Sequence, residues 1–268
     1  MFDDIRQKSE WESIERISKG WSADEKYYIR TREGKSLLLR CSDIGKYEAK
    51  KKEYEMIKRC SQLGFLMSAP VDFGICNQGK TVFMLLTWME GEDLEQVLPR
   101  LSADKQYMLG RKAGAILKKI HSLPVEQADI PQDTKKEKKL AQLSRYEQSQ
   151  VRMEQDQAVI DFNRWKVGDP YEEFYKLESF GTELSIPYCI GQIDEYFDDH
   201  IPEAFWAAHA VYTAHASLHS IVWAEKFGQQ DIDRMKERCR RIWRDYNDFA
   251  LNKPGWYTEN YRACVKNP

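Results

Sequence analysis

"KSLLLRC", residues 35–41, followed closely by "KYEAKKKEYEMIKRCSQLG", residues 46–64, is the stretch of sequence that decides the fold. The first segment is a short apolar run that begins after a Glu-Gly turn, and it predicts a β-strand. The second segment is highly charged, but it carries a narrow apolar stripe that is typical of an amphipathic helix, formed by Tyr54, Ile57 and Leu63. Gly64 fits the C-terminal end of this helix.

The segments on either side of this strand and helix predict four more strands. They lie at residues 12–20, 25–31, 70–76 and 81–89, and turns that contain glycine separate several of them. The first ninety or so residues are therefore expected to form a small β-rich region with a single helix.

From Gly91 onward the sequence pattern becomes helical. The clearest helices are expected at 102–121, where Ser102 is the candidate cap, at 202–228 and at 230–251. The inward face of the first of these is expected from its apolar positions, Met108, Leu109, Ala113, Ile116, Leu117 and Ile120. We therefore expect an α+β fold with two lobes, a β-rich lobe at residues 1–90 and a larger helical lobe at 91–268.

Composition excludes several classes of protein. The 268 residues carry a net charge of −2, which gives no sign of general nucleic-acid binding. The apolar runs are too short to span a membrane, and the N-terminal residues lack the apolar core of a signal peptide, so a cytoplasmic location is expected by default. None of the six cysteines lies at C-x-x-C spacing, which argues against a zinc site or a dithiol motif.

Several residues are candidates for binding a nucleotide. Transfer of a phosphoryl group needs positive charge on the phosphates and Mg²⁺ held by carboxylates. Arg40 lies near the end of the predicted strand at 35–41, and Glu53 of the following helix can pair with it and fix its direction. Gly20 and Ser22 lie between two predicted strands, where backbone N–H groups could cover phosphates. Each of these features alone is common in proteins without any nucleotide.

A second stretch, "QAVIDFNRWKVGDPYEEF" at 157–174, adds two candidate acids, one after a short apolar run and one after the polar turn that follows it. A short apolar strand delivers Asp161, and a polar turn then leads to Asp169 in a Gly-Asp-Pro sequence. In kinases, an Asp that follows such a strand holds the Mg²⁺ that bridges the phosphates of ATP.

Taken together, these segments resemble the aminoglycoside phosphotransferase family and its relatives similar to choline kinase and homoserine kinase. The matching stretches are "ISKGWSADEKYYI", "LLLRCSD", "KKKEYEMIKRC", "LLTWMEGEDL", "AGAILKKIHSLP" and "VIDFNRWKVGDPYEEF". The resemblance implies a two-lobed, protein-kinase-like fold and ATP-dependent transfer of the γ-phosphoryl group to a hydroxyl of a small molecule.

The resemblance also implies a role for each matching residue. Arg40 would contact the phosphates, Glu53 would orient Arg40, Asp161 would bind Mg²⁺, and Asp169 would brace the loops of the active site. The segment that links the lobes would meet adenine through Thr87, Trp88 and Glu90. The implied cofactors are ATP and Mg²⁺, and the implied partner is a small hydroxylated substrate rather than a nucleic acid or a membrane.

One part of the family pattern is missing. The family carries a loop of the type His-Gly-Asp-x-x-x-x-Asn shortly before the "IDF" strand, and its Asp accepts the proton of the substrate. No His in this chain is followed by Asp within two residues, and the only Gly-Asp is residues 168–169. By comparison with kinase spacing, about 30 to 40 residues are missing near 153–158. Either the chain is a true deletion variant, or the sequence omits a segment that the native protein has.

Three functions remain open at this point: a phosphotransferase, a catalytically dead nucleotide-binding or scaffold protein, and an interaction protein that uses its aromatic helical lobe. The nature of the acceptor is also open. Acidic residues could attract a cationic substrate or simply form the wet face of a helix: Asp194, Glu195, Asp198 and Asp199. Tryptophans could line a substrate pocket or pack in the core: Trp206, Trp223, Trp243 and Trp256.

Overall fold

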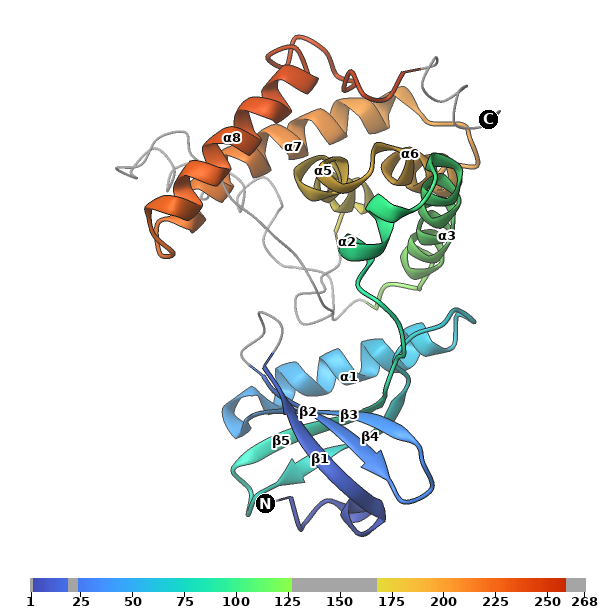
Figure 1. Cartoon of the computed structure of the whole chain (residues 1–268), viewed down its shortest axis with the longest axis vertical. Coiled ribbons are helices and arrows are strands. Elements are labelled where there is room, and N and C mark those ends of the chain that lie inside the picture. Colours follow the sequence, from blue (N-terminus) through green and yellow to red (C-terminus); the bar gives the residue numbers. More distant parts are fainter. Residues whose placement is uncertain (1, 19–23, 127–167, 259–268) are drawn as a thin grey trace. The chain divides into compact units, whose positions relative to one another are not determined.

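The computed structural model describes residues 2–18, 24–126 and 168–258. These residues divide into two compact units, of which the first ends at Gly91 and the second begins at Glu92 (Figure 1). The first unit is a β-sheet with one long helix, and the second is helical in its described part, so the expected α+β fold is confirmed.

The first unit is built on a sheet of five strands in the order β1-β2-β3-β5-β4, in which every neighbouring pair is antiparallel. The strands are β1 Trp11–Ile17, β2 Glu25–Thr31, β3 Ser36–Asp43, β4 Pro70–Cys76 and β5 Thr81–Thr87. All five expected strands are present, although β1 and β5 end earlier than predicted. The helix α1, Tyr47–Ser61, follows β3 as expected, and Gly64 just beyond it has a φ of +70°, which suits a glycine better than any other residue.

Strand β3 is covered on both faces. Alternate residues of a strand point to opposite sides of the sheet. One set, Leu37, Leu39 and Cys41, lies in a core that also contains residues of the N-terminal segment, namely Phe2, Ile5 and Trp11. On the other face α1 lies across the sheet (Figure 1), where Ile57 packs with Met84, Leu86 and Leu38. The side chains that alternate with the first set, Arg40 among them, are therefore held between the sheet and α1.

The second unit contains short helical turns and four longer helices among its described residues. The short elements are α2 Leu94–Val97, the 3₁₀-helices Leu98–Arg100 and Pro170–Phe174, the π-helix Leu177–Gly181 and α5 Thr182–Leu184. The longer helices are α3 Ala103–His121, α6 Ile186–Tyr196, α7 Glu203–Ala224 and α8 Gln229–Asp245.

The three helices that the sequence predicted clearly are present, but two of them end early. Helix α8 stops at Asp245, although the sequence predicted it to residue 251. The residues Asn247, Asp248 and Phe249 have φ values of +49°, +54° and +59°, and this left-handed backbone cannot continue a right-handed helix. Helix α7 ends at Ala224 rather than at 228, where Gly228 has a φ of +105°.

The N-terminus of α3 is formed differently from the prediction. Ser102 occupies the N-cap position, but its side chain makes no capping hydrogen bond. Instead, the side-chain amide of Gln106 donates hydrogen bonds from its Nε2 atom to the carbonyl oxygens of Leu98 and Leu101, at 3.0 and 2.8 Å. A side chain within the helix therefore ties its first turn to the preceding segment.

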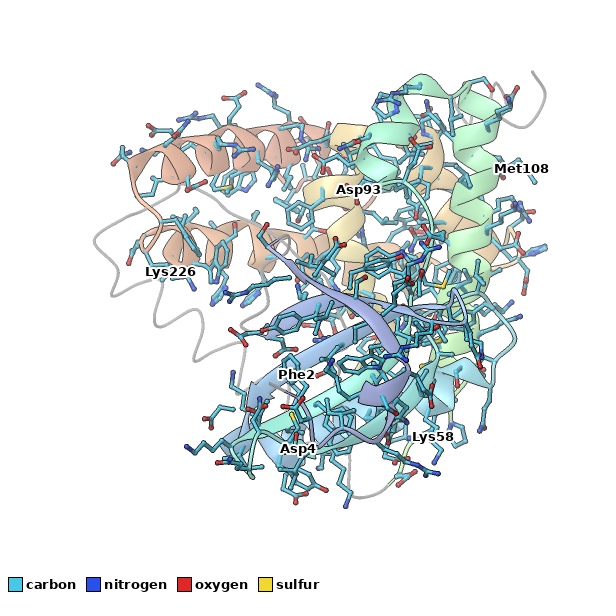
Figure 2. The ribbon with its side chains drawn as sticks, turned by 60° about the horizontal axis from the view of Figure 1, so that its bottom comes forward. Phe2, Asp4, Lys58, Asp93, Met108 and Lys226 are labelled. Carbon is cyan, nitrogen blue, oxygen red and sulfur yellow. The ribbon has the colours of Figure 1, made fainter. Side chains whose placement is uncertain are left out.

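The buried face of α3 was predicted incorrectly at one of its apolar positions. Met108 is 54% exposed and points outward from the helix (Figure 2), whereas the buried positions are Tyr107, Gly110 and Gly114. Glycine does not contribute to an apolar pattern, yet these two glycines let α3 approach α6 closely. A Cβ atom at Gly110 would lie 2.0 Å from the carbonyl oxygen of Tyr188 in α6. The contact therefore depends on the absence of a side chain rather than on an apolar one.

The close crossing of α3 and α6 predicts that Gly110→Ala is destabilising. Alanine is normally favoured over glycine in a helix by about 1 kcal/mol, but here its Cβ atom would meet backbone that cannot move aside. We expect the free energy of unfolding to fall by about 2 kcal/mol or more, as measured by urea denaturation. The matched control is Gly91→Ala, because no atom lies within 4 Å of a Cβ placed there. Equal stability of the two variants would contradict the proposed tight contact.

Candidate functional site

The predicted pairing of Arg40 with Glu53 is confirmed. Arg40 of β3 points to the face of the sheet that α1 covers, and the Nη1 atom of its guanidinium lies 2.7 Å from Oε1 of Glu53. Both side chains are at least nine-tenths buried, with 10% and 3% of their surface exposed. The strand places the cation and the helix places the acid, so the two opposite charges meet between the sheet and α1.

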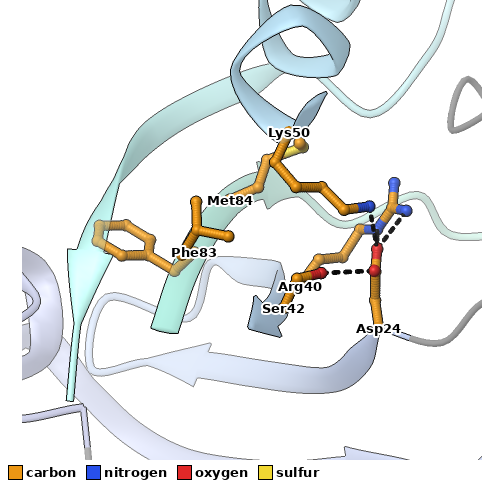
Figure 3. Close-up of a pocket in the computed structure, with 7 residues that line it drawn as sticks. Asp24, Arg40, Ser42, Lys50, Phe83 and Met84 are labelled. Carbon is orange, nitrogen blue, oxygen red and sulfur yellow. Dashed lines mark hydrogen bonds and ion pairs between the residues drawn. The ribbon is translucent and has the colours of Figure 1, made fainter. Parts of the chain in front are cut away.

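A second acid, Asp24, lies on the other side of Arg40 (Figure 3). Its Oδ2 atom accepts hydrogen bonds from Nε and Nη2 of Arg40, at 3.1 and 2.6 Å. Its Oδ1 atom accepts a bond of 2.6 Å from the hydroxyl of Ser42, two residues along β3. Asp24 precedes the first residue of β2, which is the neighbour of β3 in the sheet, and this position brings its carboxylate to the two side chains.

Lys50 of α1 completes the cluster. Its ammonium group lies 2.7 Å from Oδ2 of Asp24 and 2.8 Å from Oε2 of Glu53, and its side chain is only 7% exposed. The two acids and two bases thus alternate around a closed ring, which we call the charge ring: Asp24, Arg40, Glu53 and Lys50. Its formal charges sum to zero, as a buried cluster requires.

The charge ring controls the ionisation of Asp24. Burial acts to raise the pKa of the Asp24 carboxyl, but the hydrogen bonds from Lys50 and Ser42 and the charge of Arg40 outweigh burial and lower this pKa below its ordinary value of 3.8. Asp24 is therefore a carboxylate throughout the neutral range.

Two members of the charge ring were missed in the sequence. Lys50 belongs to the run "KKK" at residues 50–52, and such a run usually lies on a solvated helix face. Only Lys50 of that run is buried, since it lies one helical turn before Glu53 on the same face of α1. Asp24 lies in a short polar segment before a strand, where an acid is usually a turn residue. The spacing of Lys50 and Glu53 could have signalled the first, but no local pattern signals the second.

The predicted adenine-contacting residues lie at the end of β5. The amide of Thr87 donates to the carbonyl oxygen of Ala69 at 2.9 Å, and that of Trp88 donates to Ser36 at 3.1 Å. The ring of Trp88 also meets Tyr28 edge to face, with centroids 4.9 Å apart. Glu90 is exposed. The backbone amides of Thr87 and Trp88 are thus both engaged within the first unit.

Gly20, Ser22 and Asp161 lie outside the described residues, as does the point near 153–158 where the family pattern is interrupted.

Asp169 lies within the second unit and joins two of its elements. Its Oδ1 atom accepts a hydrogen bond of 3.0 Å from the amide of Tyr171 and so caps the 3₁₀-helix that begins at Pro170. Its Oδ2 atom accepts a bond of 2.5 Å from the hydroxyl of Tyr212 in α7. This carboxylate therefore holds the start of the 3₁₀-helix against α7.

The acidic residues after position 193 are mostly paired with residues of α3. Asp194 is fully buried and accepts hydrogen bonds from the hydroxyls of Tyr107 and Tyr257, so of the two alternatives left open the wet helix face is wrong for this residue. The others pair with cations of α3: Glu195 and Asp199 with Arg111, and Asp198 with Lys118. These acids join helices to each other.

The four tryptophans singled out in the sequence are at least partly buried. Trp206 and Trp256 lie in the main core of the second unit, and Trp223 and Trp243 are half-buried. The indole of Trp256 also donates a hydrogen bond to Glu178, which is completely buried. Core packing thus accounts for Trp206 and Trp256.

Two other classes of feature are absent from the described part of the chain. No cluster of three or more His, Cys, Asp or Glu side chains suited to a metal ion occurs there. Among the same residues, no helix has both the length and the apolar character needed to cross a bilayer.

The charge ring predicts that Lys50→Met strongly destabilises the chain. The substitution would leave two buried carboxylates facing one guanidinium, and loss of one partner from a buried ion pair typically costs about 3–5 kcal/mol. Urea denaturation at pH 7 would measure this, with the exposed neighbour Lys51→Met as the matched control, which should change stability by less than about 0.5 kcal/mol.

The charge ring also predicts that the stability of the folded chain falls at acidic pH. Because the pKa of Asp24 is lowered by folding, its stabilisation is present above pH 3.8 and is lost as the pH falls through the lowered pKa. For the urea test of the two lysine variants, similar unfolding curves for Lys50→Met and Lys51→Met would contradict the role assigned to the charge ring.

A protein-family model described as "Phosphotransferase enzyme family" matches residues 13–157, which is more than half of the 268 residues. This matched range contains all members of the charge ring and ends before Asp161. No curated protein sequence matches the chain.

Solved structures of similar fold include phosphotransferases and kinases. The GDP complex of wild-type aminoglycoside 2'-phosphotransferase-IIIa is 13% identical, with a TM-score of 0.64, and the match covers 90% of this chain and 96% of that one. The gentamicin complex of APH(2")-IIa is 14% identical, with a TM-score of 0.59 and coverage of 90% and 94%. Amicoumacin kinase hAmiN, in complex with AMP-PNP, Ca²⁺ and Ami, is 13% identical, with a TM-score of 0.56 and coverage of 89% and 90%.

At such low identity these structures establish the fold alone, which is the kinase-like fold that the sequence predicted. The family itself follows from the match over residues 13–157. The chain therefore belongs to the phosphotransferase enzyme family.

Proposed function

We propose that this chain binds ATP and that its family activity is transfer of the γ-phosphoryl group to a hydroxyl of a small molecule. The observation that carries the proposal is the contact between Arg40 and Glu53, in which a strand cation is held by a helix acid 2.7 Å away. A guanidinium presents several N–H donors in one plane and remains charged, so it suits phosphate oxygens. Two of the similar solved structures contain AMP-PNP and GDP, which supports the use of a nucleotide.

The other proposed roles follow from position in the first unit. Arg40 and Lys50 would bind phosphate oxygens, while Glu53 would keep both cations in place. Gly20 and Ser22 would cover the phosphates with backbone N–H groups. The segment from Thr87 to Glu90 would meet the base through backbone groups other than the two amides already engaged in the sheet.

The acceptor is proposed to be a small hydroxylated molecule. The aminoglycoside kinases of similar fold support this class, since one of them is complexed with gentamicin. The acids that follow position 193 add no support for a cationic acceptor, because they are bonded to tyrosines or paired with cations of their own unit. The proposed acceptor is therefore defined by the chemistry common to the class, a free hydroxyl group.

Nucleotide binding tests the role of Arg40 directly. Arg40→Lys keeps the charge but loses the planar set of donors, so we expect the dissociation constant for Mg-AMP-PNP to rise about tenfold. Isothermal titration calorimetry would measure the change. The matched control is Arg30→Lys on the neighbouring strand β2, because Arg30 is exposed and should leave the affinity unchanged. No binding by the wild-type chain, or equal affinities in the two variants, would refute the proposed phosphate role.

Mg²⁺ is proposed to bind Asp161, because this acid follows a short apolar run as the metal-binding Asp of a kinase does. Asp161 would hold the ion, which would supply positive charge to offset that of the phosphates. Asp161→Ala should then weaken the binding of Mg-ATP more than that of metal-free ATP, because its partner is the metal. Calorimetry with and without Mg²⁺ separates the two, and equal weakening of both would count against a metal role.

Catalysis is expected to be poor in the chain as written. Arg40 and Asp161 can hold a nucleotide, but the sequence lacks the Asp that would position and deprotonate the acceptor hydroxyl. General-base assistance typically contributes about 10²–10⁴-fold, and orientation can contribute more. We therefore expect no turnover in the usual kinase range of about 1–100 s⁻¹.

Steady-state ATP consumption would check this prediction, with a panel of aminoglycosides, choline, homoserine and sugars as acceptors. The comparison is a chain in which a family-type loop is restored between Gln155 and Ala158. Activity that appears only after restoration would identify the missing segment as the cause. Turnover in the usual range without the loop would show that another residue supplies the base.

A further inference from the structure

One oxygen atom, Oδ2 of Asp24, receives three charged donors. They are Nε and Nη2 of Arg40 at 3.1 and 2.6 Å and Nζ of Lys50 at 2.7 Å. The other oxygen of the same carboxylate accepts from Ser42 at 2.6 Å. The side chain of Asp24 is 3% exposed. Two cations and a hydroxyl converging on one small anion make the kind of environment that also binds a phosphate oxygen.

Asp24 also competes with Glu53 for Arg40. The aligned hydrogen bonds of the guanidinium go to Asp24, whereas its contact with Glu53 is close but poorly aligned. The Oε1 atom of Glu53 is buried and receives no aligned hydrogen bond from the described residues. A buried carboxylate oxygen with an ion pair but no aligned hydrogen bond is less well satisfied than one that has both. Arg40 is thus turned toward Asp24 at the expense of the helix acid that anchors it.

We infer that Asp24 is an internal counterion which occupies the place of a nucleotide phosphate oxygen and limits nucleotide affinity. The inference rests on the proposed function, since it assumes that Arg40 and Lys50 bind the phosphates. A polyphosphate oxygen would replace Oδ2 of Asp24 on both cations, and Arg40 would then be able to align with Glu53. Of the two acids, Asp24 is the one that yields, because Glu53 extends from a helix packed on the sheet while Asp24 lies just outside the first residue of β2.

This role has a consequence opposite to that of a purely structural ion pair. A residue that only stabilises the first unit would weaken nucleotide binding when it is removed, because the site would be less ordered. An internal competitor would strengthen binding when it is removed, because the nucleotide no longer has to displace it.

The test measures binding of Mg-ADP to the full chain by isothermal titration calorimetry. Asp24→Asn removes the charge but keeps the shape of the side chain, and we expect the dissociation constant to fall about tenfold. The matched control is Asp43→Asn, which changes the net charge by the same amount. Asp43 is suitable because it is exposed at the end of β3, where its carboxylate accepts a hydrogen bond from the backbone amide of Gly45. This control should leave the affinity close to that of the wild type.

A second variant keeps the test decisive if Asp24→Asn does not fold. Ser42→Ala removes only the hydroxyl that holds Oδ1 of Asp24, so it should lower the dissociation constant by a smaller factor, about two- to fivefold. Wild-type binding that is equal to or tighter than binding by the folded variants would overturn the inference and leave the proposed function standing. Failure of the wild type and the variants alike to bind Mg-ADP would overturn both.

Discussion

The first unit depends on the requirement that a buried charge must be neutralised. Arg40 lies between a sheet and a helix, and an unpaired guanidinium at that place would be severely penalised by its loss of water. Its two acids come from different elements, Asp24 from the start of β2 and Glu53 from α1. Lys50 then balances the second negative charge. Positioning α1 on the sheet and neutralising Arg40 are therefore parts of one arrangement, and neither is complete without the other.

The alternation of side chains along β3 explains why this arrangement is possible. Leu37, Leu39 and Cys41 fill the core on one face, so the polar side chains of Arg40 and Ser42 are directed to the other face. On that face Ile57, one helical turn after Glu53, packs on the sheet, so apolar side chains share the face with the charge ring. The same low-polarity surroundings strengthen each ion pair and increase the cost of losing one.

The parts of this structure that sequence could predict are those with a local pattern. The strands, α1 and the pairing of Arg40 with Glu53 follow from apolar runs and from the order of a strand cation and a helix acid. A run of lysines is typical of a solvated helix face, so only the i, i+3 spacing of Lys50 and Glu53 could have distinguished Lys50 from its exposed neighbours. Gly110 and Gly114 were overlooked for a related reason, because a close helix crossing requires that nothing project there.

The choice of arginine over lysine at position 40 follows from the same geometry. Its Nε and Nη2 atoms bond Asp24 while Nη1 contacts Glu53, so one planar group spans two carboxylates on opposite sides. A lysine ammonium is a single point charge and could not present a paired edge to one acid while it contacts the other. With Lys50 already supplying a point charge to both acids, the guanidinium adds the directional component. A planar fork and a point charge together suit an anion with several oxygens, such as a polyphosphate, better than two groups of either kind alone.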